Sequence, residues 1–497
     1  MILLLAMRGW GKPGVNAGGL QVGTPLDFSF YFPGYAEGGI SGELTWTASA
    51  ITNYTRMPHV LTMNPVKQMV PRQRFPEAII DGHCEGYLWD GTSVEAQFAP
   101  YTYPMPGYSK IRMMYRYGGS SFGTIAKSGR FVEAYRHTSL EFVVNQSIWF
   151  EGEAQFADII LPACTSLERW DIGEWAGAGG YGHDAQAQLN HRMIVMQHKC
   201  IEPLGESKSD YQIFLEILNR LGLGALFSEG CSELDWCKRV FDGSDLPKKV
   251  SWKKFLEKGY YVVPPPESVA LREPPYFRWF AEGRKKDVPE PHPLPCQFAD
   301  EAGYGLQTPS GKIEFVAETL KRNCPDSEER PPLNKYIPSW EGLRTRDLVD
   351  KYPLQLISTH SRYSFHTYSD GKKSSLNSIS EHRVMVDGYP YWVIGINPQD
   401  ARARGIQHHS LVRVFNDRGS VICAADLTPA VRQGVLKGHE SSAEFDFVET
   451  DKGLVDRGGC LNILTPDRRM MKGTEGMGSN SCLVNVEAWH DQHIFMN

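Results

Sequence analysis

The sequence predicts an α/β region with parallel strands, followed by a C-terminal β-barrel. In the first part of the chain, short apolar runs are separated by stretches long enough for crossover connections, which is typical of parallel strands. After residue 352, shorter β-type runs recur at hairpin spacing. A compact barrel is the economical fold for about 145 such residues.

Composition bounds the class of protein. The 497 residues exceed the usual length of one domain, and with 41% hydrophobic and 22% charged residues they match ordinary globular usage, which argues against a membrane span. Lysine and arginine are scattered and the net charge is −6, so the sequence excludes a nucleic-acid surface. Residues 1–7 are apolar but too short for a signal core or a span.

The ten cysteines contain no close C-x-x-C pair. Even the nearest two, Cys231 and Cys237, are separated by five residues, whereas iron–sulfur and structural zinc sites use tighter spacing. We therefore expect reduced, mostly buried thiols, a cytoplasmic location and no metal ligand from this chain.

The elements follow in order along the chain. Residues 122–135 form a connecting helix or loop between the first two strand runs. Residues 208–222 open on N-cap candidates, carry apolar residues at helical spacing and end on glycine, which predicts a helix. Residues 240–300 are rich in Pro, Lys and Glu and are expected to be irregular. The predicted parallel strands are 112–119, 142–146 and 158–162, and the predicted barrel strands are 354–357, 391–396, 411–415 and 419–424.

Domain boundaries follow from these changes in composition. Residues 1–330 are interpreted as the α/β region, 331–351 as a Pro- and charge-rich linker and 352–497 as the barrel. Within the barrel, Asn416-Asp417-Arg418-Gly419 predicts a hairpin turn between two strands.

Motifs in a consistent order connect the chain to a known family. Residues 397–406 (NPQDARARGI) with the following strand and turn resemble the dinucleotide-binding domain of the dimethyl-sulfoxide-reductase superfamily of molybdopterin enzymes, a double-psi β-barrel. The other motifs that resemble this family are 157–163 (ADIILPA), 308–314 (TPSGKIE) and 12–14 (KPG). Any one of them would be weak, because NPxD also caps helices and ADIILP fits any buried strand.

A narrower resemblance concerns one branch of that superfamily. Residues 31–42 and 190–210 resemble the large subunits of pyrogallol–phloroglucinol transhydroxylases. The resemblance implies molybdenum, two molybdopterin guanine dinucleotides, a small polyphenol substrate and an iron–sulfur small subunit as partner. Family large subunits begin with a domain that has no counterpart at the start of this sequence. We therefore expect a gene fragment, a split subunit or a missing upstream segment, and no turnover by this chain alone.

Cofactor-binding residues are expected in loops. Gly118, Gly119 and Ser120 follow a strand run, where α/β sheets bind ligands, although a glycine pair is also an ordinary turn. Asn145 and Gln146 end the next run, with a plain turn as the alternative. The loop 359–367 packs hydroxyls, imidazoles and an arginine densely, which favours cofactor contact over surface polarity. Its predicted contacts are Thr359, His360, Ser361, Arg362, Tyr363, Phe365 and His366, and Asn462 and Asn480 resemble family contacts in later loops.

Tyr31, Tyr35 and Tyr181 are the candidate catalytic residues. A phenol can stack on, or hydrogen-bond to, a phenolic substrate, while aromatic core packing is the alternative for each. The implied reaction is hydroxyl transfer between polyhydroxylated benzenes. The open alternatives are an oxo-transfer reductase of the same superfamily, and a cofactor-binding fragment without catalysis.

Overall fold

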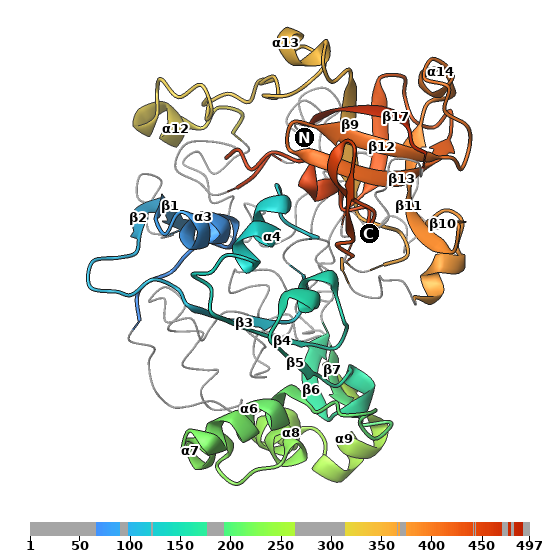
Figure 1. The fold of residues 1–497 in the computed structure, drawn as a ribbon. Helices are drawn as coiled ribbons and strands as arrows, with labels where there is room; N and C mark the ends of the chain where they lie inside the picture. The colour runs from blue at the N-terminus through green and yellow to red at the C-terminus, as the bar shows by residue number, and fades with distance from the viewer. Residues whose placement is uncertain are drawn as a thin grey trace, which may run out of the picture. The chain divides into compact units, whose positions relative to one another are not determined.

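The chain forms two compact units that alternate along the sequence (Figure 1). Unit 1 comprises Met1–Val66, Cys164–Ser327 and Pro331–Lys335, and unit 2 comprises Lys67–Ala163, Glu328–Arg330 and Tyr336–Asn497. The predicted sequence domains 1–330, 331–351 and 352–497 stay a prediction. The computed structural model describes residues 66–89, 98–120, 123–175, 193–263, 314–364, 366–367, 374–440, 442, 444–469, 476–478 and 482–490.

Unit 2 contains a parallel sheet built from the three predicted strand runs. β3 (Met113–Tyr117) pairs with β4 (Phe142–Ser147), and β4 pairs with β5 (Ile159–Pro162), both in parallel. Between the first two strands the chain forms a turn and then α4 (Gly129–Tyr135), which buries Phe131 and Val132. The crossover connection therefore exists as the spacing predicted.

A closed β-barrel forms the C-terminal part of unit 2, drawn in orange and red in Figure 1. Six strands close the ring in the order β11, β14, β9, β17, β12, β13, with β13 returning to β11. The pairs β9 with β14 and β11 with β13 are parallel, and the other pairs of the ring are antiparallel. The strands are β9 (Leu354–Thr359), β11 (Tyr389–Ile396), β12 (Leu411–Asn416), β13 (Gly419–Leu427), β14 (Val435–His439) and β17 (Leu483–Ala488).

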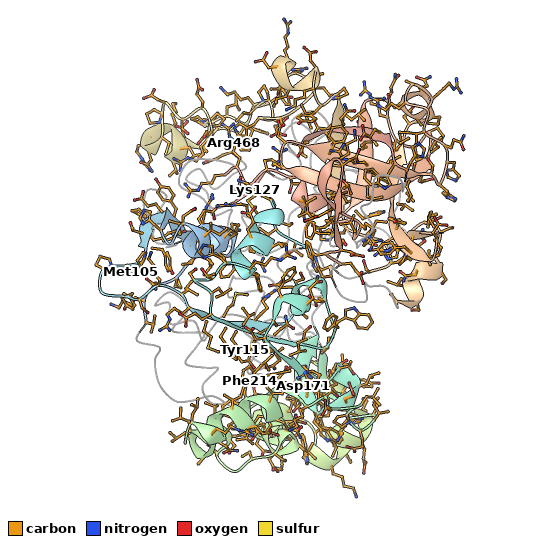
Figure 2. All side chains as sticks on the ribbon, viewed as in Figure 1. Met105, Tyr115, Lys127, Asp171, Phe214 and Arg468 are labelled. Carbon is orange, nitrogen blue, oxygen red and sulfur yellow. The ribbon has the colours of Figure 1, made fainter. Side chains whose placement is uncertain are left out.

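The parallel sheet region and the barrel share one hydrophobic core. Phe131, Leu140 and Val143 from the first segment belong to the same buried cluster as barrel residues such as Ile394 and Val412. Backbone bonds add to the contact. Lys127, labelled in Figure 2, donates its amide to the Thr465 carbonyl at 3.1 Å. Loops at the carboxyl end of the sheet and loops of the barrel are thereby held against each other.

Unit 1 combines a small antiparallel sheet with helices. β6 (Asp171–Trp175), β7 (Met193–Gln197) and β8 (Tyr260–Val262) pair in that order. The predicted helix is confirmed as α6 (Asp210–Arg220), with the Ser209 hydroxyl accepting from the Gln212 amide. α7 (Gly224–Ser228), α8 (Glu233–Asp242) and α9 (Trp252–Lys258) follow, drawn in green in Figure 1.

The expectation of irregular structure across 240–300 was wrong for its first part, where α8 ends and α9 and β8 form. The lysines that suggested a surface excursion lie on the outer side of α9, while Phe255 is fully buried against Phe241 and Trp252. The Ser251 hydroxyl caps this short helix by accepting from the Lys254 amide.

The predicted fold class is confirmed by the parallel sheet and the closed barrel. The hairpin is confirmed as well, because β12 and β13 pair from Leu411 to Asn416 through the predicted turn. In the described part of the chain, no helix is long and apolar enough to cross a membrane. The remaining elements are η2 (Arg72–Arg74), α3 (Phe75–Ile80), β1 (Cys84–Trp89), β2 (Phe98–Tyr103), η3 (Gly152–Phe156), η4 (Ser166–Glu168), η5 (Leu246–Lys248), α12 (Glu318–Asn323), α13 (Arg346–Val349), η8 (Ser375–Ser378), β10 (Arg383–Val386), α14 (Pro398–Arg402), β15 (Phe447–Thr450), β16 (Gly453–Asp456) and η9 (Leu461–Ile463).

Candidate functional site

The candidate site begins where β3 and β4 end. Gly118 and Gly119 follow β3 directly and both take positive φ values of 59°, a conformation that residues with a Cβ rarely adopt. The Gly118 amide donates to the Gln146 carbonyl at 2.8 Å, and the Gln146 side chain accepts from the Tyr115 hydroxyl. The two predicted groups of cofactor-binding residues therefore meet at one edge of the sheet.

Three buried polar atoms at this edge have no hydrogen-bond partner among the residues that the structure describes. They are Ser120 Oγ, Asn145 Oδ1 and Glu151 Oε2. The residues that carry them are 3%, 3% and 2% exposed. Buried polar groups in folded proteins are almost always paired, so a cluster of such atoms indicates a place where something else binds.

Thr367 connects this edge to the barrel. Its hydroxyl accepts from the Ser120 amide at 3.1 Å, and its side chain also hydrogen-bonds the Glu151 carboxyl. Ser147, the last residue of β4, lies with its hydroxyl 3.5 Å from the same carboxyl. The ends of β3 and β4 and the loop after β9 thus form one continuous polar network.

Two glutamates in this network have different environments. Glu153 lies with Oε1 3.2 Å from Arg116 Nε and accepts a hydrogen bond from the Tyr135 hydroxyl. Among the described residues, the Glu151 side chain has hydroxyl partners only. Burial, with the neighbouring Glu153 carboxylate adding to it, raises the pKa of Glu151 to about 8. Burial and the same carboxylate also raise the pKa of Tyr135. The site therefore holds a carboxylic acid that stays neutral at pH 7 beside an ion pair.

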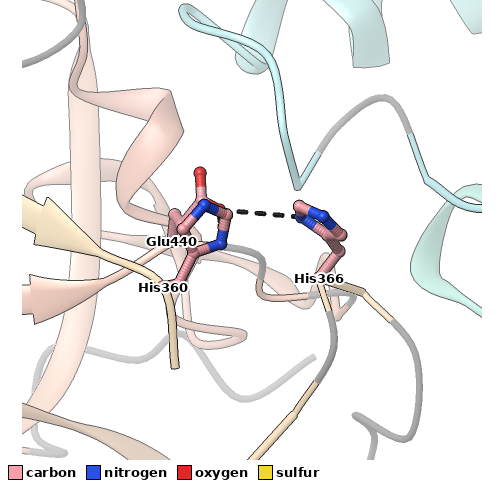
Figure 3. A group of neighbouring side chains, drawn as sticks. All are labelled: His360, His366 and Glu440. Atoms are coloured by element: carbon pink, nitrogen blue, oxygen red, sulfur yellow. Dashed lines mark ion pairs between the residues drawn. The ribbon is translucent and has the colours of Figure 1, made fainter. Parts of the chain in front are cut away.

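The loop after β9 carries a second cluster, shown in Figure 3. Glu440, which follows β14, places Oε1 2.7 Å from His360 Nδ1 and 3.8 Å from His366 Nδ1. The three ligand-type atoms lie within 4.8 Å of one another, a spacing that a metal ion or simple ion pairing can use. The expectation of no metal ligand from this chain stays a prediction.

A buried histidine, His382, and a half-buried one, His439, contact residues of this loop. Ser361 Oγ lies 3.3 Å from His382 Nδ1, and the His382 ring packs edge-on against Trp392 with centroids 4.6 Å apart. Burial, with the nearby His439 adding to it, lowers the pKa of His382 to about 4. His439 is half-buried, and this partial burial lowers its own pKa; its Nδ1 lies 3.5 Å from the Thr359 hydroxyl. Both imidazoles are therefore neutral at pH 7.

Arg362 faces outward from the same loop. The Arg362 side chain is 78% exposed and lies 3.8 Å from Glu381. The same carboxylate accepts from the Tyr363 hydroxyl at 2.7 Å and thereby raises the pKa of that phenol. A surface pair of this kind contributes little to stability, and it leaves the arginine accessible.

Asn462 occupies a structural position. Its side-chain amide donates to the Gly123 backbone carbonyl at 2.8 Å, and the Asn462 backbone carbonyl accepts from the Ser128 backbone amide at 3.2 Å. Contact of Asn462 with a cofactor stays a prediction. The predicted residues Tyr31, Tyr35, Tyr181, Phe365 and Asn480 lie outside the described residues.

Four further polar residues of the site carry no family motif: Glu151, Thr367, His382 and Glu440. Thr367 is the last residue of the polar loop 359–367 that the sequence singles out, although it was not among the predicted contacts of that loop. Glu151 and Glu153 lie two residues apart, just before the ADIILPA strand. Because glutamates are rarely buried, two of them beside a predicted buried strand could have indicated a functional role. His382 and Glu440 have no such signal, because only the folded barrel brings them beside the loop.

Two protein-family models match the segments of the chain that carry the two polar clusters. Residues 11–220 match the molybdopterin oxidoreductase model and residues 354–483 match the molydopterin dinucleotide binding domain. The pyrogallol hydroxytransferase large subunit of Pelobacter acidigallici is 46% identical over 98% of this chain and 57% of that protein. Dimethyl sulfoxide/trimethylamine N-oxide reductase of Cereibacter sphaeroides is 27% identical over 77% of this chain and 42% of that protein.

The structural comparison agrees at the level of the fold. Acetylene hydratase from Pelobacter acetylenicus superimposes with a TM-score of 0.50 at 15% identity, covering 76% of this chain and 44% of that one. The chain spans about half the length of the curated relatives that it matches. The two matched models lie in the order that the motifs predicted, and their residues include both polar clusters. The chain belongs to the molybdopterin oxidoreductase family of enzymes.

Proposed function

We propose that this chain is part of a molybdenum enzyme with two molybdopterin guanine dinucleotides that transfers a hydroxyl group between polyhydroxylated benzenes. One observation carries the proposal. The 46% identity to a pyrogallol hydroxytransferase large subunit extends over 98% of the chain, whereas the matched reductases are 27–29% identical over smaller shares of it. Because the chain spans 57% of that relative, the proposed activity is that of the whole protein.

The residues present fit such a cofactor. A dinucleotide pterin carries phosphates and a base edge that need hydrogen-bond donors and acceptors, together with close backbone approach. Gly118 and Gly119 provide backbone without side chains at the end of β3. Ser120 Oγ and Asn145 Oδ1 are buried there with no partner among the described residues, and a polar ligand would satisfy them.

Bound molybdenum would supply the redox step, and the protein's part is to bind, orient and exclude water. His360 and His366, held by Glu440, present imidazoles on the loop after β9. Imidazole nitrogens in this position can hold or move a proton. Tyr31, Tyr35 and Tyr181 are proposed to contact the aromatic substrate, since a phenol can stack on and hydrogen-bond to another phenol.

Two alternatives follow from the same family membership. The first is an oxo-transfer reductase, in keeping with the relatives at 27% identity. The second is a cofactor-binding part without catalysis of its own. The higher identity to the hydroxytransferase over nearly the whole chain favours the hydroxyl-transfer proposal over the first alternative.

Partners and location form part of the proposal. The relative is named a large subunit, which supports a smaller partner subunit, and we propose that this partner holds the iron–sulfur clusters. The cysteines of the described residues are free thiols, most of them buried, in keeping with a reducing compartment such as the cytoplasm.

The test begins with the protein purified in complex with its partners. Molybdenum and pterin are quantified first, and we expect both to be present in stoichiometric amounts. Conversion of pyrogallol to phloroglucinol is then compared with reduction of dimethyl sulfoxide and trimethylamine N-oxide. Loaded protein that reduces the oxides but leaves pyrogallol unchanged would establish the reductase alternative instead.

A further inference from the structure

We propose that Glu151 is a cofactor-binding residue that acts as a neutral carboxylic acid and donates a hydrogen bond from Oε2 to an acceptor oxygen or nitrogen of the bound molybdopterin dinucleotide. This inference rests on the proposed function, because it requires that the dinucleotide binds at the end of the parallel sheet. No family motif selects Glu151, and the proposal follows from its contacts.

The contacts of Glu151 contrast with those of Glu153, two residues away. Both are buried, at 2% and 1% exposure. Glu153 pairs with the Arg116 guanidinium and accepts from the Tyr135 hydroxyl, so its charge is compensated. The partners of Glu151 are the hydroxyls of Ser147 and Thr367. A buried carboxylate without a cation or amide donors in contact is expensive, whereas a protonated one is not.

The charged groups around Glu151 act in opposite directions. Arg116 on β3 favours the carboxylate, while Glu153 on η3 and burial favour the acid, and the latter two prevail to give a pKa of about 8. Arg72 on η2 faces Arg116 and Glu153, and its own pKa is lowered chiefly by burial. The remaining contacts of Glu151, on β4 and on the loop after β9, are hydroxyls that do not titrate in this range.

The position of Oε2 points to a ligand. This atom is buried with no hydrogen-bond partner among the described residues, as are Ser120 Oγ and Asn145 Oδ1. The three residues are connected: the Ser120 amide bonds Thr367, Thr367 contacts the Glu151 carboxyl, and Ser147, two residues after Asn145 on β4, contacts the same carboxyl. A protonated carboxyl there offers one donor, and a pterin or a phosphate offers acceptors, so one bound dinucleotide can satisfy the set.

The test compares two neutral replacements in the cofactor-loaded protein. Glu151→Gln keeps a side-chain donor in the same shape, and we expect pterin content per folded protein within about twofold of wild type. Glu151→Leu removes the donor, and we expect retention after gel filtration to fall about tenfold or more, since a lost buried hydrogen bond typically weakens binding by that order. Glu153→Gln is the matched control. It should lower the melting temperature instead, because Arg116 loses its carboxylate partner.

A pH series keeps the test decisive if the leucine variant does not fold. Pterin retention by wild type should fall as the pH rises through about 8, where Glu151 loses its proton, and retention by Glu151→Gln should not. The infrared band of a protonated buried carboxyl should be present in wild type at pH 7 and missing in the glutamine variant. Equal losses in both Glu151 variants, or retention in both, would overturn the inference while the proposed function stands. Wild type without pterin would overturn both.

Discussion

His382 shows how burial, more than any charged neighbour, sets the charge of a residue in this site. It is 1% exposed and packs against Trp392, so it titrates at about 4 in the folded chain instead of near 6.5. Its pKa is lowered on folding, so the unfolded chain binds more protons in this window. The stability that His382 contributes is therefore present above pH 6.5 and is lost as the pH falls toward 4.

The corresponding prediction compares wild type with His382→Gln. The loss of melting temperature between pH 7 and pH 4.5 should be smaller in the variant, because its side chain does not gain a proton on unfolding. In free energy of unfolding, the acid-induced loss in wild type should exceed the loss in the variant by at most about 3 kcal/mol at pH 4.5. Asp456, whose pKa is raised to about 6 mainly by burial, titrates in both proteins and cancels in the comparison. Parallel acid profiles would show that His382 is protonated in the fold.

At the same scale, His366 and Arg362 should behave differently. His366 belongs to the cluster with His360 and Glu440, and its Nδ1 lies 3.8 Å from the Glu440 carboxylate. The Arg362 side chain, in contrast, is 78% exposed beside Glu381. We expect His366→Ala to reduce pterin retention about tenfold, the size of one charge-assisted contact, and Arg362→Ala to change it less than about twofold. Pterin content per folded protein measures this. Equal effects would mean that Arg362 reaches the cofactor in the loaded protein.

Among the elements, the segment before α4 depends on close backbone contact with the barrel. A Cβ added at Gly123 would lie 2.5 Å from the Ser442 carbonyl oxygen and 2.6 Å from Thr367 Cγ2. The Asn462 amide also bonds the Gly123 carbonyl at 2.8 Å. A larger residue at this position would push the end of the parallel sheet away from the loop that carries Thr367.

Gly123→Ala should therefore destabilise the protein by about 1–3 kcal/mol, as overpacking does, and should reduce pterin retention as well. Gly129→Ala is the control on the same connection. No atom of the described residues lies within 4 Å of a Cβ added at Gly129, and alanine in a helix gains up to about 1 kcal/mol relative to glycine. Denaturant unfolding measures both variants. A neutral Gly123→Ala would show that the contact can open without cost.

For the whole molecule, the two units have separate hydrophobic cores. Phe255 is fully buried in unit 1 with Phe241 and Ile194, while the core of unit 2 runs from α4 through the barrel strands. The parallel sheet and the barrel of unit 2 should consequently open as one cooperative body, although the predicted boundary separates them in sequence.

Phe255→Ala tests this division. It should cost about 3–5 kcal/mol in unit 1 and accelerate amide hydrogen exchange in β7 and α8, with exchange in β11 and β13 unchanged. Mass spectrometry after deuterium labelling resolves these peptides. Faster exchange across the barrel strands as well would show that both units unfold together.

The sequence by itself determined the local elements and the family. Ser209 and Gly222 mark α6, and Asn416 to Gly419 mark the β12–β13 hairpin, because caps and turns are set by neighbouring residues. The parallel strands followed from apolar runs, and the motifs indicated a molybdopterin enzyme. The sequence-based prediction was wrong for α9, because the lysines on the exposed face of this short helix resemble the composition of an irregular surface segment.

Only the tertiary structure decided how the site is assembled. Thr367 meets Ser120 across 247 positions of the chain, and Glu440 reaches His360 only because β14 and β9 pair in parallel. The neutral state of Glu151 and the low pKa of His382 are likewise invisible in the sequence. Both come from burial, which depends on packing between segments that are distant in the chain, and no local pattern encodes it.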